Sequence, residues 1–291
     1  MPKQKALCVG INNFANLPNA RLSGCVNDAN DMAALLVETR GFATSDITIL
    51  TDAAATKAAV MSALRGLVNL AADGNLDTLV FSFSSHGTQV PDLDGDEQPE
   101  TMGELKGTKA DEAFCPTDLI QKGDIWDADH VISDDELHDV FVTVPVTCAV
   151  EVFMDTCHSG TGLKAIDLLG FPGQPRPRYL APPSFAAFRA LNAPKATPKP
   201  RSMLSTAKEP RKADAVTRKG SILWAGCRSD QTSADATFDN RPNGAFTYFY
   251  IKNARLNPKA TRAQLITRVR ADLKRAKYEQ IPQLELDATT R

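Results

Sequence analysis

The sequence lacks a strong charge of either sign. Lys and Arg number 33 against 35 Asp and Glu, which gives a formal net charge of −2. A general nucleic-acid-binding protein would carry a basic surplus. No run of residues approaches the roughly 18 apolar residues of a membrane helix, and the start, "MPKQKALCVGINNF", lacks the charged-then-apolar layout of a signal peptide. We therefore expect a cytoplasmic protein that binds neither nucleic acid nor membrane.

The cysteines also lack the spacing that is typical of metal-binding sites. The six cysteines form no C-x-x-C pair and no Cys/His set that would supply zinc ligands, and a chain of 291 residues needs no disulfide framework. Cys8, Cys148 and Cys227 lie in apolar stretches, which is typical of buried thiols. Cys157 differs, because in "VFMDTCHSG" (152–160) it follows the apolar run, where a loop would expose it. That position suits a nucleophile.

Strand-like and helix-like segments alternate along much of the chain. Apolar runs occupy 6–11, 77–87, 146–160 and 221–231, with weaker ones at 46–50 and 282–287, and helical patterns occupy 26–41, 56–74, 246–256 and 261–277. We expect Asn27 or Asp28 to cap the first helix, Gly41 to end it, and Thr56 to cap the second. The alternation predicts an α/β fold with a mostly parallel central sheet, helices on both faces, and a site at the carboxyl ends of the strands.

Two segments interrupt this alternation. Residues 91–124 are acidic and contain Gly and Pro, whereas 165–220 are basic, rich in Pro and without periodicity. The second segment predicts a flexible linker that is open to proteolysis. We therefore expect a single domain made of 1–164 and 221–291, joined by this linker.

A cysteine nucleophile needs a base, because it attacks as the thiolate. His86 is the best candidate, since it ends one strand-like run as Cys157 ends another. His158 adjoins Cys157 and would point away from it, while His130 and His138 fall in or beside a helix-like segment. A surface histidine unrelated to a loop cysteine is the alternative.

The residues around this pair provide a further candidate. Gly87 follows His86, and its backbone N–H, together with that of Cys157, would form an oxyanion hole.

The sequence resembles a known family at these residues. "SSHGT" at 84–88 and "DTCHSG" at 155–160 are similar to the His-Gly and Cys-His-Ser-Gly elements of caspase-like peptidases, specifically the metacaspases. Further similar stretches occur in family order at 22–32, 92–97, 111–118, 132–138, 226–235, 244–250 and 280–287. The resemblance implies a caspase-hemoglobinase fold, a p20-like part (1–164), a p10-like part (221–291) and a type I-like peptidase without a prodomain.

The resemblance is to metacaspases rather than to caspases proper. The signature Q-A-C-x-G is absent, and His86 and Cys157 lie farther apart than the roughly 50 residues typical of caspases. It implies a Cys-dependent endopeptidase with Cys157 as nucleophile and His86 as base.

The resemblance also implies that Asp28 and Asp155 line the S1 pocket, with Asp230 as a weaker third candidate. Carboxylates there favour Arg or Lys at P1, because a buried guanidinium or ammonium must be paired. The alternatives are that Asp28 caps a helix and that Asp155 supports the structure. A cleavage profile dominated by Asp at P1 would reject this hypothesis.

A calcium site of the EF-hand type is not expected at "DLDGDE". This stretch begins like an EF-hand loop at Asp92, but Glu97 stands where a Gly is required and Gly103 where a bidentate Glu is required.

The resemblance implies a different calcium site, held by Asp111, Asp134 and Asp135. Lys164 stands where a further acidic ligand would be expected. The alternative is that Asp134 and Asp135 only cap the helix that follows.

The linker carries candidate cleavage sites of its own. "PRKAD" (210–214) and "TRKGS" (217–221) offer basic residues in a segment that we expect to be accessible. We therefore predict a monomeric, calcium-stimulated endopeptidase that cleaves proteins after Arg or Lys, itself included. The alternatives are an uncut linker, a catalytically silent interaction module, and a related endopeptidase with a different P1 preference.

Overall fold

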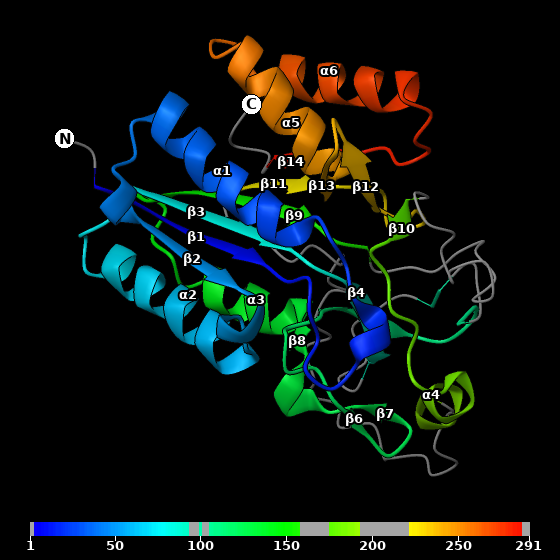
Figure 1. Cartoon of the computed structure of the whole chain (residues 1–291). Helices are drawn as coiled ribbons and strands as arrows, with labels where there is room; N and C mark the ends of the chain where they lie inside the picture. Colours follow the sequence, from blue (N-terminus) through cyan, green and yellow to red (C-terminus); the bar gives the residue numbers. More distant parts are fainter. Residues whose placement is uncertain (1–2, 93–98, 101–104, 158–174, 193–220, 287–291) are drawn as a thin grey trace.

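The computed structural model describes residues 3–92, 99–100, 105–157, 175–192 and 221–286. A six-stranded sheet crosses its centre in the order β14-β11-β9-β3-β1-β2 (Figure 1). Five strands are parallel and β14, at one edge, is antiparallel to β11. The bounds are β1 Gln4–Gly10, β2 Ile47–Thr51, β3 Thr78–Ser84, β9 Ala149–Asp155, β11 Ser221–Ala225 and β14 Gln283–Leu286.

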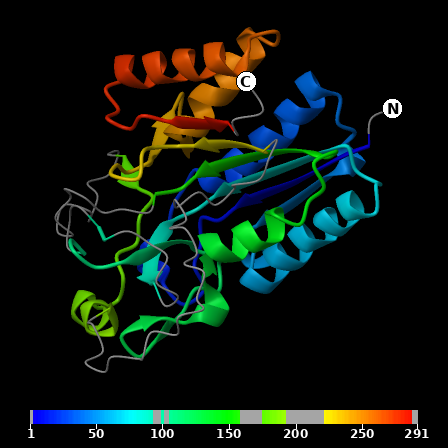
Figure 2. The same cartoon turned by 180° about the vertical axis from the view of Figure 1, so that it is seen from behind.

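Helices cover both faces of this sheet (Figures 1 and 2). One face carries α1 (Cys25–Arg40), α5 (Ala245–Leu256) and α6 (Arg262–Arg275), and the other carries α2 (Lys57–Ala72) and α3 (Asp134–Phe141). Each face has its own apolar core. The expected α/β fold with a mostly parallel sheet is confirmed.

Small sheets surround the carboxyl ends of the parallel strands, at the right in Figure 1. One is β4-β5-β8 (Gly87–Pro91, Ala110–Phe114 and Ile132–Ser133), another is β10-β12-β13 (Arg176–Pro177, Ala234–Phe238 and Arg241–Gly244), and a third is β6-β7 (Gln121–Lys122 and Ile125–Trp126). These sheets place β4, β10 and β12 around the end of the central sheet where a site is expected.

Strand β9 alternates between the two cores. Val150, Val152 and Met154 pack with the α2 and α3 side, whereas Glu151 and Asp155 bind residues of α1, α5 and α6 on the opposite side. Both of these carboxylates are buried, at 5% and 2% exposure. They share a face because side chains along a strand repeat every second residue.

The helix ends agree with the sequence at two positions and differ at a third. Gly41 ends α1 in the left-handed conformation with φ 73°, and the Thr56 hydroxyl accepts a hydrogen bond from the Ala59 N–H at the start of α2. The first helix, however, is capped by Gly24, so neither Asn27 nor Asp28 is its N-cap. Asp28 lies inside the first turn and is free to bind elsewhere.

The predicted flexible linker is ordered over part of its length. Residues 176–177 form β10 and Phe185–Asn192 form α4, where Phe188 is buried against Leu105 and Ala110. The expectation of an unstructured linker over the whole of 165–220 is therefore wrong for 175–192. The proposed cleavage stretch 210–214 lies outside the described residues, as does all of 217–221 except Ser221.

Over the described ranges, no helix is long and apolar enough to cross a membrane.

Candidate active site

The two candidate catalytic residues follow neighbouring parallel strands. The pairing of β3 with β9 ends at Ser84 and Asp155, which lie opposite each other. His86 and Cys157 each come two residues later, so the register brings them to the same level beyond the sheet. This is the arrangement expected from the sequence.

The imidazole of His86 is buried and oriented by a main-chain carbonyl. Its Nε2 lies 2.8 Å from the carbonyl oxygen of Ala20, and among the described residues its Nδ1 has no hydrogen-bond partner. A carbonyl only accepts, so the proton is on Nε2 and Nδ1 carries the lone pair. Burial lowers the pKa of His86 to about 4. The ring is therefore neutral at pH 7, and its Nδ1 lone pair accepts no hydrogen bond from the described residues.

No sequence pattern points to the Ala20 carbonyl. A backbone group has no side-chain signature, and Ala20, at the end of the 18–20 turn, contacts His86 although 66 residues separate them.

Cys157 is fully buried in this structure. Its thiol donates a hydrogen bond to the carbonyl oxygen of Gln231, 2.7 Å away, and it clusters with Tyr179 and Cys227. The predicted position after the strand is correct, but the expected exposure is not, because Cys157 is buried in this cluster. His158 lies outside the described residues.

A buried arginine lies beside the strand ends, between several carboxylates. Arg178 is 0% exposed, and its guanidinium lies 2.7 Å from Asp28, 3.2 Å from Asp155 and 2.9 Å from Asp235. We call Asp28, Asp155 and Asp235 the acidic cluster. Burial alone would lower the pKa of Arg178, but these carboxylates raise it, so the guanidinium stays charged.

The acidic cluster is fixed at the N-terminus of α5. Asp28 accepts hydrogen bonds from the Gly244 N–H and the Asn243 amide, and Asp155 accepts from the N–H and hydroxyl of Thr247. Unpaired N–H groups and the helix dipole at this end favour negative charge. A Cβ on Gly244 would lie 2.2 Å from an Asp155 oxygen, so only glycine leaves room for the cluster there.

The third carboxylate is not the predicted one. Asp230 lies at the surface and pairs with Arg228 at 2.8 Å, whereas Asp235 on β12 contacts Arg178. Asp230 belongs to the turn after β11, and the chain reaches the cluster only after it has turned back into β12. The position of β12 could not be predicted from the sequence. Its partner β10 is distant along the chain, and its partner β13 is a short strand like β12 itself.

The main chain around Arg178 is paired on both sides. Arg176 and Pro177 pair antiparallel with Asp235 and Ala234, and the Arg178 N–H donates to the Ser233 carbonyl at 2.9 Å. We call residues 175–180 the bound segment.

The bound segment then meets Gly87. The Arg178 carbonyl accepts a hydrogen bond from the Gly87 N–H at 2.9 Å, and the Leu180 N–H donates to the Gly87 carbonyl. The carbonyl of Arg178 is thus held by the N–H group that the sequence suggested for an oxyanion hole. An extended chain with one side chain in a charged pocket is how a peptide substrate would lie.

Comparisons with known proteins identify the family of this chain. A family model described as the caspase domain matches residues 3–291. Metacaspase-1A of Aspergillus niger is 33% identical over 97% of this chain and 70% of its own length. The chain belongs to the metacaspases. The match to Metacaspase-1 of Cryptococcus neoformans, at 32% identity, includes 97% of this chain but only 62% of the length of that relative.

Solved structures show the same fold. The protein GSU0716 from Geobacter sulfurreducens matches 99% of this chain and 94% of its own, with a TM-score of 0.65 and 28% identity. The match to Caspase-1 from Spodoptera frugiperda covers 98% of this chain and 88% of that one. Its TM-score is 0.55 at 11% identity, which supports the fold alone.

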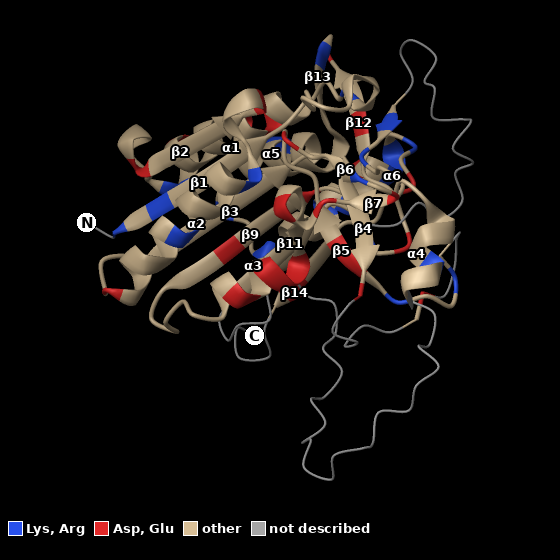
Figure 3. Cartoon of the chain, turned by 90° about the horizontal axis from the view of Figure 1, so that it is seen from below, with Lys and Arg blue, Asp and Glu red and all other residues tan. Residues whose placement is uncertain are grey.

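The candidate calcium ligands of this metacaspase lie on β5 and α3, where Figure 3 shows acidic residues on both elements. Asp111 is on β5, and Asp134 and Asp135 stand in the first turn of α3. The N-cap of α3 is Ser133, so these two aspartates favour the helix through its dipole rather than by capping it. In the part of the chain that the structure describes, no three ligating side chains form a metal site. Lys164 lies outside that part.

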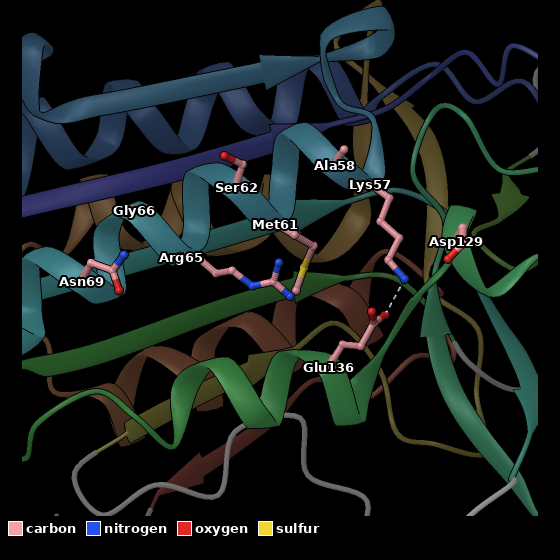
Figure 4. Close-up of a pocket in the computed structure, with 9 residues that line it drawn as sticks. All are labelled: Lys57, Ala58, Met61, Ser62, Arg65, Gly66, Asn69, Asp129 and Glu136. Carbon is pink, nitrogen blue, oxygen red and sulfur yellow. Dashed lines mark hydrogen bonds and ion pairs between the residues drawn. The ribbon is translucent and has the colours of Figure 1, made fainter.

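A pocket elsewhere in the molecule is built between α2 and α3 (Figure 4). Lys57 and Glu136 form an ion pair of 2.8 Å across it, and Arg65 and Asp129 also line it. No residue of the candidate active site belongs to this pocket.

Proposed function

We propose that this metacaspase is a cysteine endopeptidase that cleaves proteins after Arg or Lys. The observation that supports it is Arg178, whose side chain lies in the acidic cluster while its carbonyl binds the Gly87 N–H. A buried pocket with three carboxylates requires a cation, because unpaired buried charge costs several kcal/mol. It would exclude an acidic P1 side chain.

The reaction follows from the groups at the strand ends. The lone pair on His86 Nδ1 takes the thiol proton of Cys157, and the thiolate attacks the P1 carbonyl carbon. The Gly87 N–H stabilises the oxyanion. His86 then gives the proton to the leaving amine, and water hydrolyses the thioester. The Ala20 carbonyl keeps the ring in the required tautomer throughout.

The first substrate in this proposal is the chain itself. With Arg178 in the P1 position, the bond to be cut is Arg178–Tyr179. This places self-processing earlier than the stretches 210–214 and 217–221 that the sequence favoured. Until the bound segment leaves, it blocks the pocket against other substrates.

Peptide hydrolysis tests the proposal. We expect turnover of a fluorogenic peptide ending in Arg-Pro-Arg, the sequence of 176–178, and none of the same peptide ending in Asp. Cys157→Ala, with the fold intact by circular dichroism, is the control and should be inactive. Preference for Asp would reject the pocket assignment.

Fragment masses test self-processing separately. Wild type incubated with calcium should yield a new N-terminus at Tyr179, and both Cys157→Ala and Arg178→Gln should lack it. Cleavage confined to 210–221 would reject Arg178 as the processing site. An intact wild-type chain would reject self-processing altogether.

Calcium stimulation is part of the proposal and rests on Asp111, Asp134 and Asp135. It is tested by the same peptide assay in calcium and in excess chelator, with Asp134→Asn as the matched variant. Equal rates in both conditions would dispose of it. The cytoplasmic location and the monomeric state stay predictions.

A silent interaction module is the competing function. Covalent labelling of Cys157 by an activated Arg peptide would exclude it, while absence of both labelling and peptide turnover in processed protein would favour it.

A further inference from the structure

The mechanism leaves one buried thiol beside the nucleophile without a role. Cys227 is 7% exposed and follows β11, the strand next to β9. It packs in one cluster with Cys157 and Tyr179. Both thiols also donate to the same acceptor, the Gln231 carbonyl oxygen, at 2.7 Å from Cys157 and 3.4 Å from Cys227.

The backbone suits a covalent link between them. The pairing of β11 with β9 ends with Ala225 opposite Met154, and the Gly226 N–H continues it to the Met154 carbonyl at 2.8 Å. Cys227 and Cys157 are therefore offset by one residue on adjacent chains. With strands about 4.8 Å apart and a rise of about 3.3 Å per residue, their Cα atoms fall near 6 Å. Disulfides have Cα separations of roughly 4.4–6.8 Å.

We propose that Cys227 is a resolving cysteine, which forms a reversible disulfide with Cys157 when the enzyme meets a peroxide. The inference rests on the proposed function, since it regulates the same nucleophile. It adds a modification site at a residue that the peptidase reaction does not use.

The chemistry needs only hydrogen peroxide as oxidant. The Cys157 thiolate attacks one peroxide oxygen, the O–O bond breaks, and the departing hydroxide takes up the proton held by His86 to leave as water. Cys157 is now a sulfenic acid. The Cys227 sulfur then attacks the Cys157 sulfur, the S–O bond breaks, and hydroxide leaves with the Cys227 proton as water. Both thiols are oxidised and the peroxide is reduced.

The bound segment controls access to this pair. Tyr179 belongs to the same buried cluster as Cys157 and Cys227, and its hydroxyl donates to the Gln89 side chain at 3.2 Å. Peroxide reaches the sulfurs only when Tyr179 moves away. The unprocessed chain is therefore protected, and the enzyme becomes sensitive to oxidation when its pocket opens.

The disulfide has a protective consequence. A sulfenic acid without a neighbouring thiol is oxidised further to a sulfinic acid, which thiol reductants do not restore. Cys227 would stop this second oxidation and make the loss of activity reversible.

The test compares wild type with Cys227→Ser, and uses Cys148→Ser as the matched control. Cys148 is also buried, but it immediately precedes β9, at the end opposite Cys157. Each protein, also in a Tyr179→Ala form that uncovers the sulfurs, is treated with hydrogen peroxide, digested without reductant and analysed by mass spectrometry.

We expect wild type and Cys148→Ser to give a cross-linked peptide pair containing Cys157 and Cys227 and lacking two hydrogen atoms. Cys227→Ser should instead carry two added oxygen atoms on Cys157. Activity regained after dithiothreitol should be about tenfold or more lower in Cys227→Ser than in wild type.

Absence of this disulfide from both wild type and its Tyr179→Ala form would overturn the proposal, as would equal recovery in wild type and Cys227→Ser. The masses are read without peptide hydrolysis, so a failure of the proposed peptidase function would be seen separately.

Discussion

Strand β9 carries two buried carboxylates on one face, and their surroundings differ. Glu151 binds Arg40 of α1, Arg262 at the start of α6 and the indole of Trp224. Asp155 shares Arg178 with the other members of the acidic cluster. At Glu151, one carboxylate contacts two guanidinium groups. At Asp155, three carboxylates share a single guanidinium.

The pKa values follow this balance of charge. Burial alone would raise the pKa of Glu151, but Arg40 and Arg262 lower it below its usual value. Burial raises the pKa of Asp28 to about 6 even though Arg178 is in contact. The excess of carboxylates means that the acidic cluster needs a cation but cannot be fully neutralised by one.

The origin of the arginines differs as well. Arg40 belongs to a core helix, so its ion pair forms whenever the domain folds. Arg178 belongs to an extended segment held by main-chain pairing, as a bound peptide would be. A buried ion pair by itself is therefore no sign of a binding site. A binding site is suggested when the cation lies on an extended segment and the carboxylates around it outnumber it.

The largest effect should come from replacing one carboxylate at each site. Asp155→Asn should lower kcat/KM for the Arg peptide on the order of 100-fold or more, because it removes a partner of a buried charge. Glu151→Gln should leave kcat/KM of the folded enzyme nearly unchanged and lower the free energy of unfolding by about 3 kcal/mol. Peptide kinetics and urea unfolding measure the two. Equal kinetic losses would erase the distinction between the sites.

The arginines provide a second contrast, in the Cys157→Ala background that prevents cleavage. Arg40→Gln should lower the free energy of unfolding by about 3 kcal/mol, because Glu151 loses its main partner. Arg178→Gln should instead release the bound segment and leave the core folded. Limited proteolysis should then cut near 175–180 in Arg178→Gln only, while a protected segment there would contradict the role given to Arg178.

Acid should separate the titrating groups of the site. The pKa of His86 is about 4 in the folded chain and lies near 6.5 when exposed, so protonation favours unfolding and stability is lost from pH 6.5 down to 4. Asp28, with its pKa raised to about 6, acts in the opposite sense between pH 6 and 3.8, since the folded chain binds the proton more readily.

The His86 contribution is measured by substitution. Between pH 7 and pH 5, the free energy of unfolding of the Cys157→Ala parent should fall by about 2 kcal/mol more than that of the same protein with His86→Gln. Chemical unfolding at the two pH values gives this difference. No difference would mean that His86 is not held neutral by burial.

The smallest effect should come from Asp230→Asn. Asp230 pairs with Arg228 at the surface, where an ion pair contributes about 0–1 kcal/mol. The rate on the Arg peptide should change less than about fivefold, whereas Asp235→Asn should match Asp155→Asn. A large loss of rate in Asp230→Asn would instead support Asp230 as a residue of the S1 pocket.

Much of this arrangement could be predicted from local sequence. His86 and Cys157 follow apolar runs, and parallel strands end at one edge of a sheet, so their placement at that edge can be predicted without further information. The resemblance predicts Asp28 and Asp155 as a pair of pocket residues, and the structure brings both into contact with Arg178. Their catalytic and binding roles stay predictions.

Asp235, the Ala20 carbonyl and Arg178 could not be found in the same way. Each reaches the site through contacts between distant parts of the chain: β10 pairs with β12, and the 18–20 turn folds onto His86. The sequence predicts a linker at the bound segment, because Pro and basic residues obscure a strand of only two residues.

The charge of the P1 side chain tests the central claim most directly. We would measure kcat/KM for the Arg-Pro-Arg peptide against one in which the last Arg is citrulline, which keeps the shape and loses the charge. The account predicts a loss on the order of 100-fold or more with citrulline, because three buried carboxylates would face a neutral group. Equal rates for the two peptides would contradict it.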